Sequence, residues 1–188
     1  MPSYQPSHNV LSSRRATVGA LFHSRVPANP SQRAVVEGAR VLSYLELEER
    51  SNRLANALLD TGLAHGDRIG LLSRNCLEYM EVELAAAKAG LILACLNWRL
   101  GDRELRHCIT LVEPKVIIAQ ADLTESLDRV DLPLHQRITM GAEYENFMAA
   151  ASDNYPDLDI DPEDGLVILY TSGTTGLPKG ALVSHRAM

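Results

Sequence analysis

A stretch of eleven residues rich in glycine and hydroxyl groups, residues 170–180, constrains the fold of this chain more than any other feature. It reads Tyr-Thr-Ser-Gly-Thr-Thr-Gly-Leu-Pro-Lys-Gly and contains four Ser or Thr residues, three glycines and one lysine. An apolar run at 166–170 leads into it, and a short apolar run at 181–184 follows it. Runs of this kind are typical of buried strands, so we predict a strand, a loop and a second strand.

The composition of this loop is suited to binding a polyphosphate. Glycines let backbone N–H groups approach a ligand closely, and successive N–H groups in such a loop form a concave site for anions. The serine and threonine hydroxyls add further donors, and Lys179 adds a positive charge. A flexible linker between two strands would need neither the lysine nor so many hydroxyl groups.

The loop differs from the Walker A phosphate loop, which ends in Gly-Lys-Ser/Thr and leads into a helix. Pro178 stands where that motif has its second glycine, and Gly180 follows Lys179 in place of Ser or Thr. These differences disfavour a kinase-like or GTPase-like protein. A helix beginning at Lys179 would contradict our interpretation.

Apolar strands alternate with helical segments between residues 66 and 119, which indicates an α/β fold. The expected strands and helices of this region are 68–72, 75–88, 91–95, 102–111 and 116–119. Strands joined through a helix in this way run parallel. We therefore predict a layered, parallel-rich sheet with flanking helices.

Local signals predict where several helices begin and end. Ser43 and Glu46 form a capping box for a helix that stops at 61–62, while Asn75 and Asp102 are the expected N-caps of the next two helices. The other expected elements are a helix at 17–25, a hairpin of strands 34–37 and 40–42, a helix at 122–129, a strand at 137–140, a helix at 143–151 and an acidic surface segment at 152–165.

Composition narrows the class of protein. The 188 residues support one sizeable core, and a net charge of −6 without a basic, aromatic-interleaved stripe disfavours a nucleic-acid partner. Residues 1–15 lack the apolar segment of a signal peptide and are interpreted as a loose leader, and no apolar run reaches transmembrane length. Cys76, Cys95 and Cys108 fit no disulfide or metal pattern, which indicates reduced thiols in a cytoplasmic protein.

The sequence of residues 170–180 resembles the signature loop of the AMP-forming, adenylate-forming enzymes, which include acyl-CoA synthetases, the adenylation domains of peptide synthetases, and luciferases. The match covers the whole loop, and weaker resemblance extends upstream over almost the whole chain. The weaker matches are Tyr44-x-Glu46-Leu47, Ser51-Asn52-Arg53-Leu54-Ala55, Gly66-Asp67-Arg68, Ala86-x-x-Ala89-Gly90 and Asn97-x-Arg99-Leu100. The stretch 96–100 favours acyl-CoA synthetases. The resemblance implies that residues 16–188 are the N-terminal part of the large AMP-binding domain, ending shortly after the phosphate loop.

The resemblance also implies a chemistry. Enzymes of this family use ATP to convert a carboxylic acid to an acyl-adenylate and pyrophosphate, and most acyl-CoA synthetases then transfer the acyl group to coenzyme A. The loop would stabilise charge on the departing phosphates. The residues implied to contact ATP are Thr171, Ser172, Gly173, Thr174, Thr175, Gly176 and Lys179. Lys179 is the candidate catalytic cation, and Thr171 is the candidate Mg²⁺ ligand.

Full enzymes of this family continue for several hundred residues, and their adenine, ribose and acidic metal-binding motifs are absent from this sequence. We therefore expect a fragment of an acid-thiol ligase that is inactive in isolation. Two alternatives stay open: a stand-alone nucleotide-binding or interaction domain, and an adenylation domain with a carrier-protein acceptor. The sequence does not define the acyl substrate, and it also allows a homodimer.

His185 follows the second strand of the loop region and has two interpretations. It would either pack in the first turn of a helix or reach an acyl substrate. We favour the packing role, and the other five histidines form no ligand or catalytic constellation that their spacing reveals.

Overall fold

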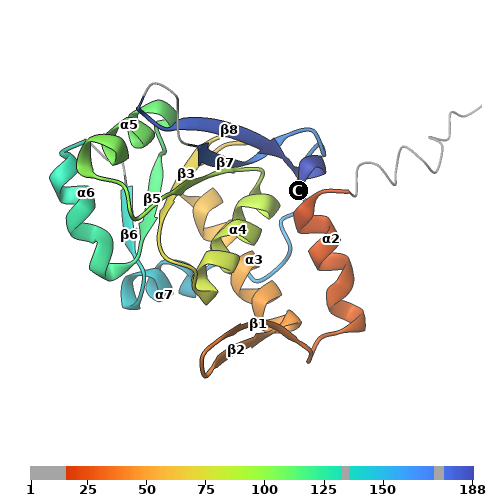
Figure 1. Ribbon diagram of the computed structural model, residues 1–188. Helices are drawn as coiled ribbons and strands as arrows, with labels where there is room; N and C mark the ends of the chain where they lie inside the picture. Colours follow the sequence, from red (N-terminus) through yellow and green to blue (C-terminus); the bar gives the residue numbers. More distant parts are fainter. Residues whose placement is uncertain (1–15, 133–135, 172–175) are drawn as a thin grey trace, which may run out of the picture.

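A six-stranded sheet in the order β6-β5-β3-β4-β7-β8 forms the centre of the computed structural model, which describes residues 16–132, 136–171 and 176–188 (Figure 1). The strands are β3 (Arg68–Leu72), β4 (Ile92–Leu96), β5 (Val116–Ala119), β6 (Gln136–Thr139), β7 (Gly165–Thr171) and β8 (Lys179–Ser184). The first five run parallel to one another, and β8 runs antiparallel to β7 at the edge of the sheet. The predicted parallel-rich α/β sheet is confirmed.

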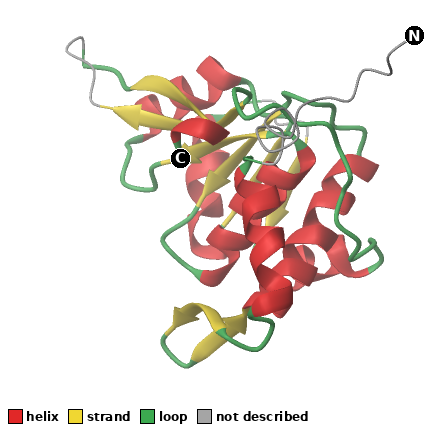
Figure 2. Ribbon diagram, turned by 90° about the vertical axis from the view of Figure 1, so that its right-hand side faces the viewer, coloured by secondary structure: helices red, strands yellow, loops and turns green. Residues whose placement is uncertain are grey.

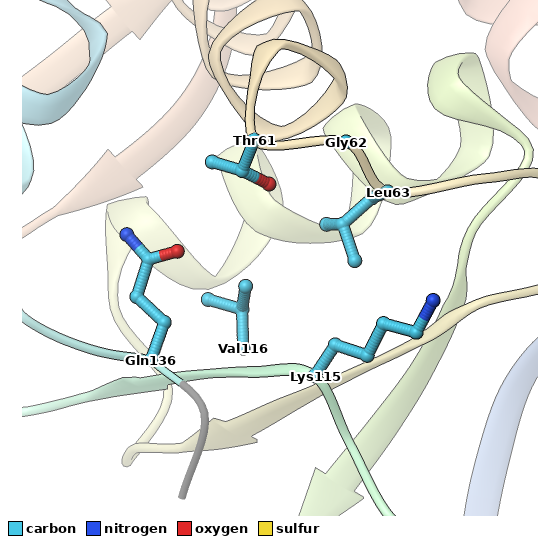
Figure 3. A pocket seen from close by; sticks show the side chains of 6 residues that line it. All are labelled: Thr61, Gly62, Leu63, Lys115, Val116 and Gln136. Atoms are coloured by element: carbon cyan, nitrogen blue, oxygen red, sulfur yellow. The ribbon is translucent and has the colours of Figure 1, made fainter.

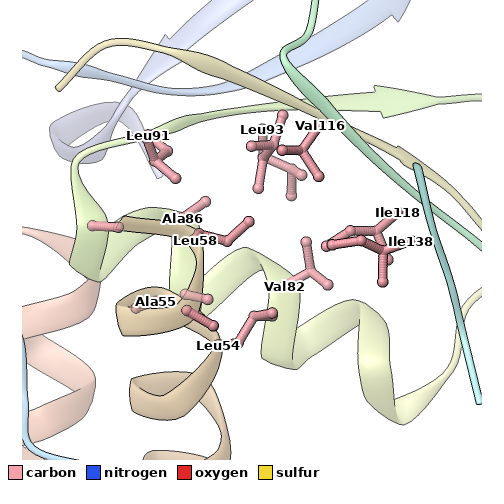
Figure 4. Packing of buried hydrophobic residues seen from close by; sticks show 14 of the residues in the cluster. Leu54, Ala55, Leu58, Val82, Ala86, Leu91, Leu93, Val116, Ile118 and Ile138 are labelled. Atoms are coloured by element: carbon pink, nitrogen blue, oxygen red, sulfur yellow. The ribbon is translucent and has the colours of Figure 1, made fainter. Parts of the chain in front are cut away.

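Helices cover both faces of this sheet. One face packs against α3 (Tyr44–Asp60), α4 (Leu77–Ala89) and α7 (Ala142–Ala149), and the other packs against α5 (Asp102–Val112) and α6 (Thr124–Val130). Successive strand residues point to opposite faces, so Ile69 and Leu71 join the core with α3 and α4, while Leu72 joins the core with α5. Figure 4 shows the first of these cores, where leucine and alanine side chains of the helices meet the strands.

The N-terminal elements lie outside the main sheet. Helix α2 (Val18–Arg25) begins at its N-cap Thr17 and continues into the short 3-10 helix η1 (Val26–Ala28). The strands β1 (Arg33–Glu37) and β2 (Arg40–Ser43) then form an antiparallel hairpin that is separate from the large sheet (Figure 2). The other 3-10 helices are η2 (Ala121–Leu123) and η3 (His185–Ala187). The predicted leader, residues 1–15, lies outside the described residues.

Two predicted helix caps are wrong by one residue. The N-cap of α4 is Cys76 rather than Asn75, and the Leu77 N–H donates to Glu37 Oε2 at 3.2 Å. The N-cap of α5 is Gly101 rather than Asp102, and its N–H donates to a carboxylate oxygen of Glu104 at 3.2 Å. In α4 a glutamate of the β1–β2 hairpin supplies the acceptor that Asn75 would have supplied. In α5 the N–H groups of Glu104 and Leu105, in the first turn of the helix, donate to the carbonyl oxygen of Gly101. The capping box of Ser43 and Glu46 is confirmed.

A buried polar cluster joins α3 to α4. The Lys88 ammonium is fully buried and donates to Glu48 Oε2 at 2.7 Å, Ser51 Oγ at 2.6 Å and Asn52 Oδ1 at 2.8 Å. His23 of α2 contacts the other oxygen of Glu48 through Nδ1 at 2.6 Å. Burial lowers the pKa of Lys88 to about 8. This cluster explains why the buried stripe of α3 contains Ser51 among leucines.

Candidate functional site

The predicted phosphate loop lies at the carboxyl end of β7, which runs parallel to its neighbour β4. In open α/β sheets, ligands bind beyond the carboxyl ends of the parallel strands. Thr171 is the last residue of β7, Lys179 is the first residue of β8, and the two are paired across the hairpin. The loop therefore begins and ends at adjacent points of one rigid sheet.

Strand β8 begins at Lys179, so the predicted strand, loop and strand are confirmed and the Walker A alternative is wrong. Thr171 and Lys179 are exposed, and Gly176 is exposed with a φ of 84°, a conformation that favours glycine. Four of the predicted ATP-contacting residues lie outside the described residues: Ser172, Gly173, Thr174 and Thr175. The glycines of the loop also predict that residues 172–178 are mobile without ATP, and most of this prediction falls on residues outside the described ranges.

A pocket of about 280 Å³ lies beside the loop, between β7 and α5. Its lining residues are Asn97, Leu100, Glu104, Tyr170, Thr171, Gly176, Leu177 and Pro178. The structure thus brings Thr171 and Gly176 to one pocket. The Thr171 hydroxyl, exposed at the loop's start, has the chemistry of an oxygen ligand for a phosphate-bound Mg²⁺.

Helix α5 contacts the chain on both sides of the loop. His107 Nε2 lies 3.1 Å from the carbonyl oxygen of Pro178, and the Tyr170 hydroxyl donates to the carbonyl oxygen of Cys108 at 3.1 Å. Pro178 is buried. Burial also raises the pKa of Tyr170, so the Tyr170 hydroxyl stays protonated and can donate this hydrogen bond. Sequence reasoning missed His107, because its partner is a backbone carbonyl that every residue type carries.

The three cysteines are free thiols, as predicted. Burial raises the pKa of each, in the case of Cys108 to about 11. A raised thiol pKa leaves little of the nucleophilic thiolate at neutral pH. The cysteines therefore have the properties of structural residues.

His185 follows the last residue of β8, which is paired with the first residue of β7. It therefore lies at the opposite end of these two strands from the loop. It is buried in the first position of η3, and its Nδ1 accepts a hydrogen bond from the Val18 N–H at 3.2 Å. Burial lowers its pKa and favours the neutral imidazole. The structure supports the packing role of His185 and separates it from the site at the loop.

A larger pocket, about 400 Å³, lies away from the loop, and Figure 3 shows the residues that line it. It is lined by Thr61, Gly62, Leu63, Lys115, Val116 and Gln136. Val116 and Gln136 begin β5 and β6, so this pocket is at the amino ends of the parallel strands. The Lys115 ammonium is already paired with Asp67 at 2.6 Å, so the loop remains the better candidate site for an anion.

Two negative findings apply to the part of the chain that the structure describes. Within residues 16–132, 136–171 and 176–188, no helix is long and apolar enough to span a membrane. The same residues contain no cluster of three or more His, Cys, Asp or Glu side chains arranged to hold a metal ion.

Comparison with known proteins identifies the family of this chain. Residues 22–188, almost the whole chain, match the family model described as AMP-binding enzyme. The chain belongs to this family. Among curated relatives, a fatty acid–[acyl-carrier-protein] ligase of Streptomyces coeruleorubidus is 33% identical over 168 residues, which cover 88% of this chain and 32% of the relative. A feruloyl-CoA synthase of an Amycolatopsis species is 35% identical over 172 residues, which cover 92% of this chain and 34% of the relative.

Solved structures of AMP-binding enzymes share the fold. A fatty acyl CoA synthetase of Mycobacterium tuberculosis superposes with a TM-score of 0.84 at 26% identity, over 92% of this chain and 35% of that one. The ATP-bound MatB of Rhodopseudomonas palustris gives a TM-score of 0.80 at 30% identity, over 91% of this chain and 35% of that one. The chain thus spans about a third of the length of the relatives that it matches.

Proposed function

We propose that this chain forms the N-terminal part of an AMP-forming acid-thiol ligase and supplies the pyrophosphate-binding end of its ATP site. The observation that carries the proposal is the loop at 170–180, held between β7 and β8 at the carboxyl edge of the sheet with Lys179 exposed. The family membership and the ligase activities named for the relatives support it.

In the proposed reaction, a carboxylate oxygen attacks the α-phosphorus of ATP. A bond forms between these two atoms, and the bond from the α-phosphorus to the bridging oxygen breaks, releasing pyrophosphate. Negative charge grows on the departing phosphates, where preorganised donors stabilise the transition state most. We assign this role to the loop from Thr171 to Gly176 and to Lys179. The Thr171 hydroxyl would help to hold Mg²⁺, which would supply further positive charge at this end of the site.

The second step transfers the acyl group to a thiol, with AMP as the leaving group. We propose coenzyme A as the acceptor, because the stretch Leu96 to Leu100 resembles acyl-CoA synthetases and a feruloyl-CoA synthase is among the relatives. The ligase of Streptomyces coeruleorubidus is named for an acyl-carrier-protein acceptor, so a carrier protein is the second candidate. The free thiols are consistent with a cytoplasmic location.

Carboxylate-dependent exchange of labelled pyrophosphate into ATP tests the adenylation step. A ligase containing this chain should exchange pyrophosphate when supplied with its acid from a panel of aliphatic and aromatic carboxylic acids. The 188 residues alone should show no exchange, since by our proposal they hold only one end of the ATP site. Exchange by the isolated chain would contradict its assignment as a part of the enzyme.

The Lys179→Ala variant tests the role of the loop. It should lower the exchange rate of the ligase on the order of a hundredfold, the typical cost of one lost transition-state contact. Thr174→Ala should cost less, because neighbouring N–H groups can serve the same phosphate oxygen. Lys115→Ala is the matched control, because this lysine lies at the amino ends of the parallel strands, away from the loop. Equal rates in the Lys179 and Lys115 variants would overturn the assigned role.

A further inference from the structure

The carbonyl of Pro178 has a specific partner on α5. His107 Nε2 lies 3.1 Å from this oxygen, and the contact is partly buried. A carbonyl oxygen only accepts hydrogen bonds, so Nε2 must carry the proton and donate it. This requirement is met both by the Nε2–H tautomer of neutral histidine and by the imidazolium.

Pro178 occupies a sensitive position in the hairpin. The β7–β8 ladder ends at the pair of Thr171 and Lys179, and Pro178 is the first residue beyond it on the β8 side. On the β7 side, the Tyr170 hydroxyl is bonded to the carbonyl of Cys108, the residue next to His107. One turn of α5 thus contacts both strands of the hairpin at the point where the loop leaves the sheet.

We propose that His107 is a positioning residue, which fixes the backbone at Pro178 and thereby the direction of the Lys179 side chain toward the departing pyrophosphate. The inference rests on the proposed role of the loop. Proline has a fixed φ, so holding its carbonyl defines the plane of the peptide bond that leads directly into Lys179. His107 itself acts through the backbone and does not contact ATP.

The proposal predicts a moderate and rescuable loss of rate. A net intramolecular hydrogen bond corresponds to about a three- to tenfold change in an equilibrium. In a ligase containing this chain, His107→Leu should lower kcat and kcat/KM for pyrophosphate exchange by about this factor. His107→Gln, which keeps an N–H donor near the position of Nε2, should recover most of the rate. Arg106→Gln, at the exposed neighbouring position on α5, should leave the rate unchanged.

A purely structural role of His107 would give a different result. The Leu and Gln variants would then differ in melting temperature while sharing one kcat per folded molecule. If His107→Leu exchanges pyrophosphate as fast as an active wild type, or if Gln fails to rescue a folded variant, the proposal is wrong.

Amide hydrogen exchange in the 188-residue chain tests whether His107 fixes the backbone at Pro178, without relying on activity. The Lys179 amide should exchange about three to ten times faster in His107→Leu than in wild type or His107→Gln, while amides of the central strand β3 keep their rates. Unchanged exchange at Lys179 would overturn the proposal even if the ligase is active. If a ligase containing this chain showed no pyrophosphate exchange with any acid, the proposed function would instead be refuted. Amide hydrogen exchange at Lys179 would still show whether His107 holds the carbonyl of Pro178.

Discussion

Replacing the buried Lys88 by methionine should destabilise this domain strongly. The ammonium is 0% exposed and donates to Glu48, Ser51 and Asn52. Methionine fills a similar volume but leaves the Glu48 carboxylate, itself 7% exposed, without its cation. Removing one partner of a buried ion pair typically costs about 3–5 kcal/mol. Since Glu48 keeps contacts with Asn52 and His23, we expect the lower value, about 3 kcal/mol.

Urea unfolding followed by circular dichroism measures this loss in the 188-residue chain. Lys115→Met is the matched control: its ammonium also pairs with a carboxylate, at 2.6 Å, but its side chain is 48% exposed. Exposed pairs contribute at most about 1 kcal/mol. The double variant Lys88→Met/Glu48→Gln should recover at least half of the loss, because no buried charge is left unpaired. Equal losses for Lys88→Met and Lys115→Met would refute the reasoning.

Two further predictions concern stability. The pKa of Lys88 is lowered from 10.5 to about 8 by burial, so between these pH values this group binds more protons in the unfolded chain than in the folded one, and its contribution to stability should rise with pH by up to about 1.4 kcal/mol per unit. Urea midpoints at pH 8, 9 and 10 should therefore rise in wild type relative to Lys88→Met, because the buried thiols, whose raised pKa values act in the opposite direction, are common to both proteins. Gly90→Ala should cost about 1–2 kcal/mol, because Gly90 caps α4 with a φ of 65° and an added Cβ would lie 2.6 Å from His65 Nδ1. Thermal melting checks the Gly90 variant, and an unchanged melting temperature would contradict the assigned strain.

The order and type of the elements could be predicted from the sequence, because periodic apolar positions and turn residues are local signals. The cap of α4 could not, since the acceptor for the Leu77 N–H is Glu37, forty residues earlier on the β1–β2 hairpin. The partners of Lys88 could not be predicted for the same reason, because they lie far from it in the sequence, on α3. Helical spacing predicted the buried stripe of α3, yet nothing in the spacing shows that Ser51 faces an ammonium from α4.

The candidate site also has one part that could be predicted from the sequence and one part that could not. The loop could be recognised because its glycines, hydroxyls and lysine are consecutive in the sequence. Its support by α5 could not be predicted, because both bonds end on backbone carbonyls, those of Pro178 and Cys108. Residue types alone carry no information about such contacts. The sequence also allowed His185 to approach a substrate, and only the antiparallel direction of β8 places it at the far edge.

The strand that begins at Lys179 has an electrostatic consequence. A phosphate loop that leads into a helix gains from the partial positive charge of the helix N-terminus, about half an elementary charge. Strands contribute only a small net dipole, so the chain leaving this loop offers no comparable field. By the proposed function, a polyphosphate at this loop would therefore draw its compensating charge within this chain mainly from Lys179 and from individual N–H groups. The positive charge of Lys179 is consequently supplemented by weaker backbone dipoles than the charge of a lysine in a loop that leads into a helix.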